Sequence, residues 1–200
     1  MTAAAAPQPH LTLVRHGDTE WSLSGRHTGW TDIPLVESGT RQAGQLGRLL
    51  AGRSFAAVLS SPLSRALETC RLAGLGDAVT TDPDLREWNY GELEGLTSDE
   101  IRQKMPGWTI WSGPVPGGET ADEVGRRADR VIERLLALDG DIAIFAHGHL
   151  LRVFAARWLG LPPDLGALFE LSTATLSRLG WERERRVVEL WNDSSHLDAG

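Results

Sequence analysis

The sequence has almost no cysteine and no long apolar segment. Cys70 is the only cysteine in 200 residues, so no intrachain disulfide can form, and we interpret it as a helix-packing residue. A chain without disulfides is typical of a reducing compartment. No apolar run approaches the roughly 20 residues that a membrane-spanning helix needs. These absences predict a cytoplasmic protein with no membrane partner.

Positive charge is also scarce. Twenty Lys and Arg residues stand against 27 Asp and Glu residues, which gives a formal net charge of −7. Nucleic acids and anionic membranes bind to basic surfaces, so we expect no nucleic-acid partner, and any anion site must be local. Lys104 is the only lysine. Nearly every cation is therefore an arginine, the residue suited to bidentate phosphate binding.

The order of apolar runs predicts an α/β fold. Residues 1–9 are Ala-rich and lack the features of a signal peptide, so we expect a disordered tail before a single domain over residues 10–200. Strands are expected at residues 11–15, 56–60, 79–81, 142–146, 173–180 and 187–191, and helices at residues 38–51, 63–73, 120–138 and 150–159. This alternation predicts a three-layer α/β/α sandwich, with helices on both faces of a mostly parallel sheet.

Three of the expected strands end in candidate phosphate ligands. Arg15 and His16 close the first strand, Arg65 opens the helix after the second, and His147 follows the strand at residues 142–146. The carboxyl ends of parallel strands meet at one edge of an open α/β sheet, where such folds bind ligands. Several Arg and His donors at that edge suit a phosphate dianion.

Together these motifs resemble the histidine phosphatase superfamily, which includes cofactor-dependent phosphoglycerate mutase, over residues 11 to about 159. The resemblance implies that His16 is the nucleophile that becomes phosphohistidine, and that Arg15, Arg65 and His147 hold the phosphoryl oxygens. It implies that Glu87, in the run Leu-Arg-Glu-Trp, is the proton donor. It also implies substrate contacts at Ser22, Thr28, Gly29, Gly148 and His149, although many members have asparagine where this chain has Ser22.

The chemistry expected of these residues needs no metal. A neutral imidazole can attack phosphorus, and neighbouring arginines both lower its pKa and stabilise the transferring oxygens. Zinc is the alternative for His16, His147 and His149, but no Asp or Glu cluster completes such a site. We therefore expect neither metal nor cofactor. For Glu87 the alternative is a surface salt bridge with Arg86 or another arginine.

The segment after Glu87 bears on the reaction type. Only Arg102 and Lys104 supply positive charge there, whereas mutases of the resembled family have a longer, more basic segment for the second charged end of the substrate. Hydrolysis is therefore the predicted reaction. Residues 26–35, 85–95 and 145–149 are similar to those of sedoheptulose-bisphosphatase-like proteins and bacterial acid phosphatases, which implies a small phosphorylated metabolite, a sugar phosphate or sugar acid phosphate.

Two alternative functions, the oligomeric state and the role of the tryptophans stay open. The chain could be a phosphoglycerate mutase, or a non-catalytic phosphate-sensing protein of the same fold, and a homodimer is possible. The complete set of predicted catalytic residues argues against the non-catalytic alternative. Most of the eight tryptophans are expected in the core, but some near the motifs could wall a substrate pocket, namely Trp21, Trp30, Trp88, Trp108 and Trp111.

Overall fold

A computed structural model describes residues 8–197, and within them six strands form one mixed sheet of order β3-β2-β4-β1-β5-β6. The strands are β1 (Leu11–Arg15), β2 (Ala57–Ser60), β3 (Val79–Thr81), β4 (Ile142–Ala146), β5 (Leu176–Glu182) and β6 (Arg185–Asp193). The first four pair in parallel, whereas β5 runs antiparallel to both β1 and β6. The sheet is thus mostly parallel, as predicted, with an antiparallel pair at one edge.

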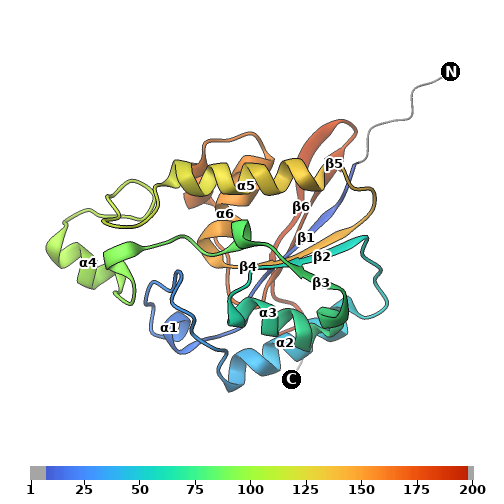
Figure 1. Cartoon of the computed structure of the whole chain (residues 1–200), viewed down its shortest axis with the longest axis horizontal. Helices are drawn as coiled ribbons and strands as arrows, with labels where there is room; N and C mark the ends of the chain where they lie inside the picture. The colour runs from blue at the N-terminus through green and yellow to red at the C-terminus, as the bar shows by residue number, and fades with distance from the viewer. Residues whose placement is uncertain (1–7, 198–200) are drawn as a thin grey trace.

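Helices cover both faces of this sheet (Figure 1). They are α1 (Glu20–Leu23), α2 (Glu37–Leu50), α3 (Ser64–Cys70), α4 (Ser98–Lys104), α5 (Ala121–Leu135) and α6 (Gly148–Trp158). Successive β1 side chains point to opposite faces: Leu13 joins the cluster that contains Val131 of α5 and Phe154 of α6, and Val14 joins the cluster of Leu46 and Cys70. The three-layer α/β/α prediction is confirmed. None of the described helices is long and apolar enough to cross a membrane.

Capping boxes mark the start of three described helices, α1, α4 and α5. Thr120 and Glu123 form the predicted capping box of α5, which ends at Leu135, three residues before the expected position. Helix α4 was not predicted, although Thr97 and Glu100 form the same kind of box. Shorter turns complete the path at η1 (Arg71–Leu75), η2 (Gly76–Ala78), η3 (Pro83–Leu85), η4 (Gly91–Leu93) and η5 (Pro163–Leu168).

The expected N-terminal tail is described only at its last two residues, because residues 1–7 lie outside the described range. Gln8 Nε2 donates a hydrogen bond to the Arg183 carbonyl at 2.9 Å. Trp181 Nε1 donates to the Pro9 carbonyl at 3.0 Å. Residues 8 and 9 therefore contact the β5–β6 hairpin.

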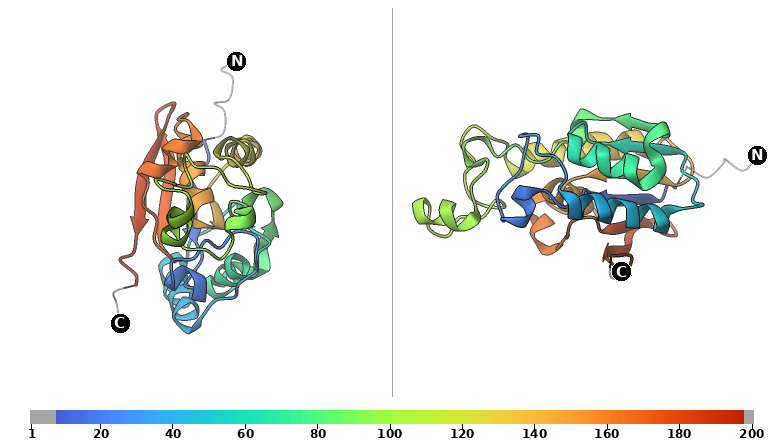
Figure 2. Two further views of the ribbon diagram at one scale, coloured as in Figure 1. Left: turned by 90° about the vertical axis from the view of Figure 1, so that its left-hand side faces the viewer. Right: turned by 90° about the horizontal axis from the view of Figure 1, so that it is seen from below.

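The connections gather at one end of the sheet. Figures 1 and 2 show α1, α4 and the loops around them on the side where β1 ends. His16, Ser61 and His147 directly follow β1, β2 and β4, so the parallel register brings them to this same edge. The candidate site is therefore at the carboxyl end of the parallel strands, under these loops.

Candidate active site

The loop that carries His16 is fixed on three sides. His16 N donates to the Ala146 carbonyl at 3.0 Å, which ties the loop to the end of β4. Gly17 N donates to Thr69 Oγ1 of α3 at 3.1 Å. A Cβ atom on Gly17 would lie 2.5 Å from the Gly39 carbonyl oxygen of α2, so glycine is required for this close approach. The loop therefore has little freedom to move.

The hydrogen bonds of His16 determine which ring nitrogen is free. Its Nδ1 lies 2.7 Å from the Gly17 carbonyl oxygen. Because a carbonyl only accepts, Nδ1 carries the proton and Nε2 carries the lone pair. Burial, with the charges of Arg65 and Arg15, holds the pKa of His16 well below its usual value. His16 is thus a neutral imidazole with an available nucleophilic nitrogen.

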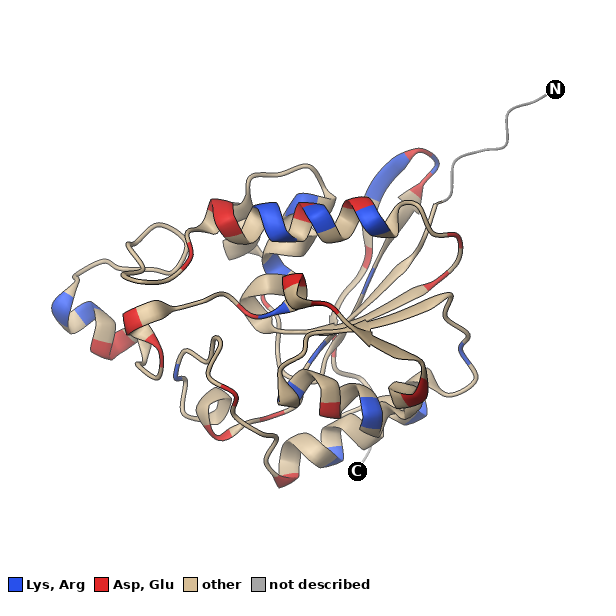
Figure 3. Cartoon of the chain, viewed as in Figure 1, with Lys and Arg blue, Asp and Glu red and all other residues tan. Residues whose placement is uncertain are grey.

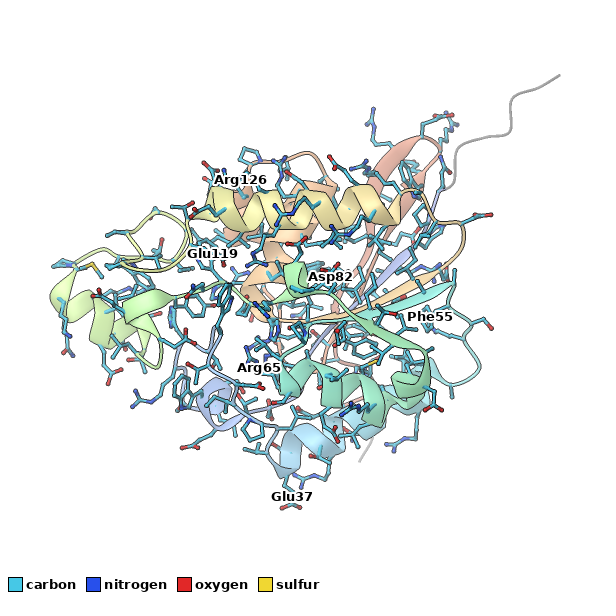
Figure 4. The ribbon with its side chains drawn as sticks, viewed as in Figure 1. Glu37, Phe55, Arg65, Asp82, Glu119 and Arg126 are labelled. Carbon is cyan, nitrogen blue, oxygen red and sulfur yellow. The ribbon has the colours of Figure 1, made fainter. Side chains whose placement is uncertain are left out.

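Arg65 lies completely buried in the first turn of α3 (Figure 4). Its Nη2 donates to the carbonyl oxygens of Gly29, at 2.7 Å, and Thr28, at 3.2 Å. Its Nη1 donates to the Thr31 carbonyl at 3.1 Å. These bonds orient the guanidinium through the loop that follows α1.

His147 lies beside His16, with ring centroids 5.2 Å apart. Its Nε2 is 2.7 Å from the hydroxyl of Ser61, a fully buried residue that the sequence analysis did not select. Burial lowers the pKa of His147 well below its usual value, and the charge of Arg65 lowers it further. His147 is therefore neutral, and Ser61 fixes the plane of its ring.

Three buried nitrogens of this cluster have no protein partner among the described residues: Arg15 Nε, Arg65 Nε and His147 Nδ1. Ser61 Oγ already accepts the Leu63 N–H, so its hydroxyl is free to donate to His147 Nε2, which leaves the proton of the neutral ring on Nδ1. Buried polar groups are normally hydrogen-bonded, so such atoms need an explanation. Arg15 is otherwise held in place, because its Nη1 donates to the Leu171 carbonyl at 2.5 Å. An oxyanion is the kind of ligand that pairs with such donors.

Glu87 caps the start of α6. Its Oε1 accepts hydrogen bonds from Leu150 N at 2.8 Å and Trp88 N at 2.9 Å, and its Oε2 accepts from His149 N at 3.0 Å. The side chain is 4% exposed, so the alternative of a surface salt bridge with Arg86 is wrong. The carboxyl group also explains why α6 begins at Gly148, two residues earlier than predicted.

A cavity of about 190 Å³ joins most of the predicted residues. Those that line it are Arg15, His16, Ser22, Thr28, Glu87, Gly148 and His149. Six further lining residues were not predicted: Gly25, Arg26, His27, Tyr90, Arg152 and Leu171. The predicted Arg65 and His147 are not among the lining residues. Figure 3 shows that acidic and basic residues alternate over other parts of the chain, such as α5, so the cationic character of the site is local.

Gly29 and Ser22 are placed differently from what the resemblance implies. Gly29 does not line the cavity, and its N–H donates to Glu94 Oε1 at 2.5 Å instead of facing the cavity. The Ser22 hydroxyl lines the cavity but is already bonded to the backbone of Thr19, in the capping box of α1. Ser22 therefore belongs to the cavity wall, whereas Gly29 only anchors the loop that follows α1 to Glu94.

Tyr90 links two histidines on the opposite wall. Its hydroxyl lies 2.5 Å from His149 Nδ1, and its ring centroid is 5.0 Å from that of His27. Burial raises the pKa of Tyr90 well above its usual value. Burial and the charge of Arg152 hold the pKa of His149 well below its usual value. Tyr90 and His149 are thus uncharged, and the positive charges near them are those of Arg26 and Arg152, of which Arg152 lies one helical turn after Gly148 on α6.

Residues 11–194 match the sequence profile described as Histidine phosphatase superfamily (branch 1). The chain belongs to this superfamily. It is 38% identical over 192 residues to an acid phosphatase of Mycobacterium tuberculosis, a match that covers 93% of each chain. It is also 38% identical over 185 residues to sedoheptulose 1,7-bisphosphatase of Saccharomyces cerevisiae, covering 76% of this chain and 68% of the relative.

Solved structures agree with the sequence relatives. A mycobacterial glucosyl-3-phosphoglycerate phosphatase in complex with VO3 superposes with a TM-score of 0.84 at 30% identity, covering 92% of this chain and 99% of the other. The predicted family and the predicted enzyme class, a histidine-type phosphatase, are confirmed at the level of the family.

The three histidines of this histidine phosphatase do not share a common ligand position. His16 is bonded to a backbone carbonyl, His147 to Ser61 and His149 to Tyr90. Within residues 8–197 no three His, Cys, Asp or Glu side chains are grouped as metal ligands. The positive charge beside His16 comes from arginines.

The buried histidines predict that the phosphatase loses stability in mild acid. The pKa values of His16, His147 and His149 are all lowered in the folded chain, whereas unfolding returns them to about 6.5. Below that pH the unfolded chain therefore binds more protons than the folded chain. Each histidine should reduce the free energy of unfolding by about 1.4 kcal/mol per pH unit.

Urea unfolding between about pH 7.5 and about pH 5.5 would measure this dependence. We expect the free energy of unfolding to fall steadily as the pH drops below about 6.5. His149→Asn removes one titrating group, so the slope of that variant should be smaller by about one proton. A free energy that stays constant over this range would contradict neutral buried histidines.

Proposed function

We propose that this chain hydrolyses phosphomonoesters of small metabolites through a phosphohistidine on His16, with no metal and no cofactor. One observation carries the proposal. The free Nε2 of neutral His16 lies in a cluster that contains three unpaired buried donors, on Arg15, Arg65 and His147. The donors suit three phosphoryl oxygens, and the nitrogen suits attack on the phosphorus between them.

The first step transfers the phosphoryl group to the enzyme. Arg15, Arg65 and His147 hold the phosphoryl oxygens while His16 Nε2 forms a bond to phosphorus. The bond between phosphorus and the ester oxygen breaks, and a proton from Glu87 passes to that oxygen. Glu87 Oε2 is the better candidate to carry this proton, because it accepts one backbone N–H whereas Oε1 accepts two.

The second step returns the enzyme to its starting state. A water molecule replaces the departed alcohol and gives a proton to Glu87 as its oxygen attacks phosphorus. The bond between phosphorus and nitrogen breaks, so His16 Nε2 regains its lone pair and inorganic phosphate leaves. The arginines stabilise the charge on the equatorial oxygens in both steps, which is the part that a metal plays in other phosphoryl transfers.

A sugar phosphate or a sugar acid phosphate is the proposed substrate. The relatives named for sedoheptulose bisphosphate and glucosyl-3-phosphoglycerate support this class. The cavity of about 190 Å³ beside His16 has room for a phosphoryl group and part of a small leaving group, which would lie against Tyr90 and His149. We propose that the enzyme acts as a single domain in the reducing cytoplasm.

Phosphoglycerate mutase remains the second candidate, because Arg26 and Arg152 line the same cavity and could hold the carboxylate of a phosphoglycerate. A mutase returns the phosphoryl group to its substrate, whereas a hydrolase releases it. Incubation with either phosphoglycerate isomer distinguishes them. We expect inorganic phosphate to accumulate, with little of the other isomer.

Turnover should survive removal of divalent metals. The cationic groups that replace a metal, Arg15 and Arg65, are covalent parts of the chain, so exhaustive dialysis against a chelator should leave kcat and KM unchanged. Assays with added zinc, magnesium or manganese complete the measurement. Loss of turnover after dialysis, followed by recovery with one of these ions, would show that the metal-free proposal is wrong.

A further inference from the structure

A second cavity adjoins the one beside His16. It has a volume of about 270 Å³ and shares two wall residues, His27 and His149, with the first cavity. Its other lining residues are Ser98, Arg102, Trp108, Thr109, Ile110 and Trp111. The two cavities therefore lie side by side at His27 and His149.

Trp111 is a rigid part of that wall. The guanidinium of Arg152 lies over its ring, 4.6 Å from the centroid, and a Cβ on Gly166 would lie 2.8 Å from the ring. The His149 ring meets it edge-on, with the centroids 5.3 Å apart. The ring is thus held from several sides and remains half-buried.

Trp108 is fixed by its own hydrogen bonds. Its Nε1 donates to the Pro114 carbonyl at 3.0 Å, and its carbonyl accepts a bond from Arg102 Nε at 3.0 Å. Arg102 also lies 3.6 Å from Asp99, so its charge is partly balanced. The second cavity therefore combines two fixed aromatic rings with polar groups, and it lacks the unpaired cationic donors found beside His16.

We propose that this second cavity is a subsite for the sugar ring of the substrate's leaving group. The inference rests on the proposed hydrolysis at His16. The C–H face of a sugar ring is apolar and suits an indole surface, while its hydroxyls need the polar groups that Ser98, Thr109 and His149 provide. His149 Nδ1 is engaged by Tyr90, so Nε2 is the atom left for a sugar hydroxyl.

A matched pair of substrates tests this subsite. Glucose 6-phosphate and glycerol 3-phosphate are both esters of primary alcohols, so their leaving oxygens are similar and only glucose 6-phosphate carries a ring. We expect a higher kcat/KM for glucose 6-phosphate. Trp111→Ala should reduce this preference about tenfold, mainly through KM, because a ring contact contributes equally to the bound substrate and the transition state.

Two variants control for indirect effects. Trp111→Phe keeps an aromatic surface and should restore most of the preference for the ring. Trp181→Ala removes a half-buried tryptophan of β5 that binds the Pro9 carbonyl, outside both cavities, and should leave the preference unchanged. Circular dichroism would verify that each variant is folded.

The outcomes separate the subsite from the proposed function. Equal kcat/KM for the two substrates, or an unchanged preference in Trp111→Ala, would overturn the subsite. The subsite would also be overturned if Trp111→Ala weakened inhibition by vanadate as much as it reduced the preference for glucose 6-phosphate. That result would show that the substitution had disturbed Arg152 and the phosphate pocket. Failure of the wild type to hydrolyse either substrate or to phosphorylate His16 would refute the proposed hydrolysis. Calorimetric binding of glucose 6-phosphate and glycerol 3-phosphate to wild type and Trp111→Ala would then test the subsite directly.

Discussion

Replacement of His16 by alanine is expected to lower kcat by about a thousandfold or more. The reason is that His16 Nε2 carries a free lone pair beside the unpaired donors of Arg15 and Arg65, whereas the unpaired Nδ1 of neutral His147 carries a proton. His10→Ala is the matched control. His10 directly precedes β1, whereas His16 directly follows it, and His10 pairs with Glu189. The His10→Ala variant should therefore keep normal turnover. Normal turnover by His16→Ala would eliminate the nucleophile from the mechanism.

Glu87→Gln is expected to lower kcat/KM for a sugar phosphate by roughly a hundred- to ten-thousand-fold, and for an activated aryl phosphate distinctly less. A sugar alkoxide needs a proton in order to leave, whereas an aryl oxide leaves readily without one. Parallel steady-state assays with both substrates would measure the contrast. The variant also replaces an oxygen that accepts the His149 N–H, so some loss on both substrates will come from the cap of α6.

Glu94→Gln provides the control for that structural loss. Glu94 accepts the backbone N–H groups of Gly29 and Thr31 but does not line the cavity, so its substitution should affect both substrates to the same extent. Equal losses in Glu87→Gln would indicate damaged binding and not a missing acid. The pre-steady-state burst isolates the first step. If Glu87→Gln leaves the burst rate with a sugar phosphate intact, another group must donate the proton.

Much of the fold was predictable from short apolar segments that have clear breaks at both ends. The strands expected at residues 79–81 and 142–146 coincide with β3 and β4, because apolar or β-branched residues stand between clear breaks. Helix α4 escaped prediction because Ile101 is its only buried residue, so its sequence shows no apolar stripe. Helix α3 ends at the π-helical turn η1, where Gly74 has a φ of 82°. The apolar periodicity of the sequence does not reveal this change of backbone conformation.

The candidate site was predictable where it follows strand ends. Arg15, His16 and His147 come together because the carboxyl ends of parallel strands converge, a consequence of the topology. Ser61 follows β2 in the same way, so the strand-end argument could have found it, whereas the position of Tyr90 depends on how loops meet and is not encoded in spacing. Arg152 had a usable signal, since it lies four residues after Gly148 on α6, and residues with this spacing share a helix face.

Rapid quenching in base tests the central claim most directly. The enzyme is mixed with a substrate that carries a radiolabelled phosphoryl group, stopped within milliseconds and digested under alkaline conditions, and the labelled peptide is identified. The mechanism predicts a label on His16 that survives alkali, is lost in acid and forms at least as fast as steady-state turnover. A label that forms at this rate on any other residue would contradict it.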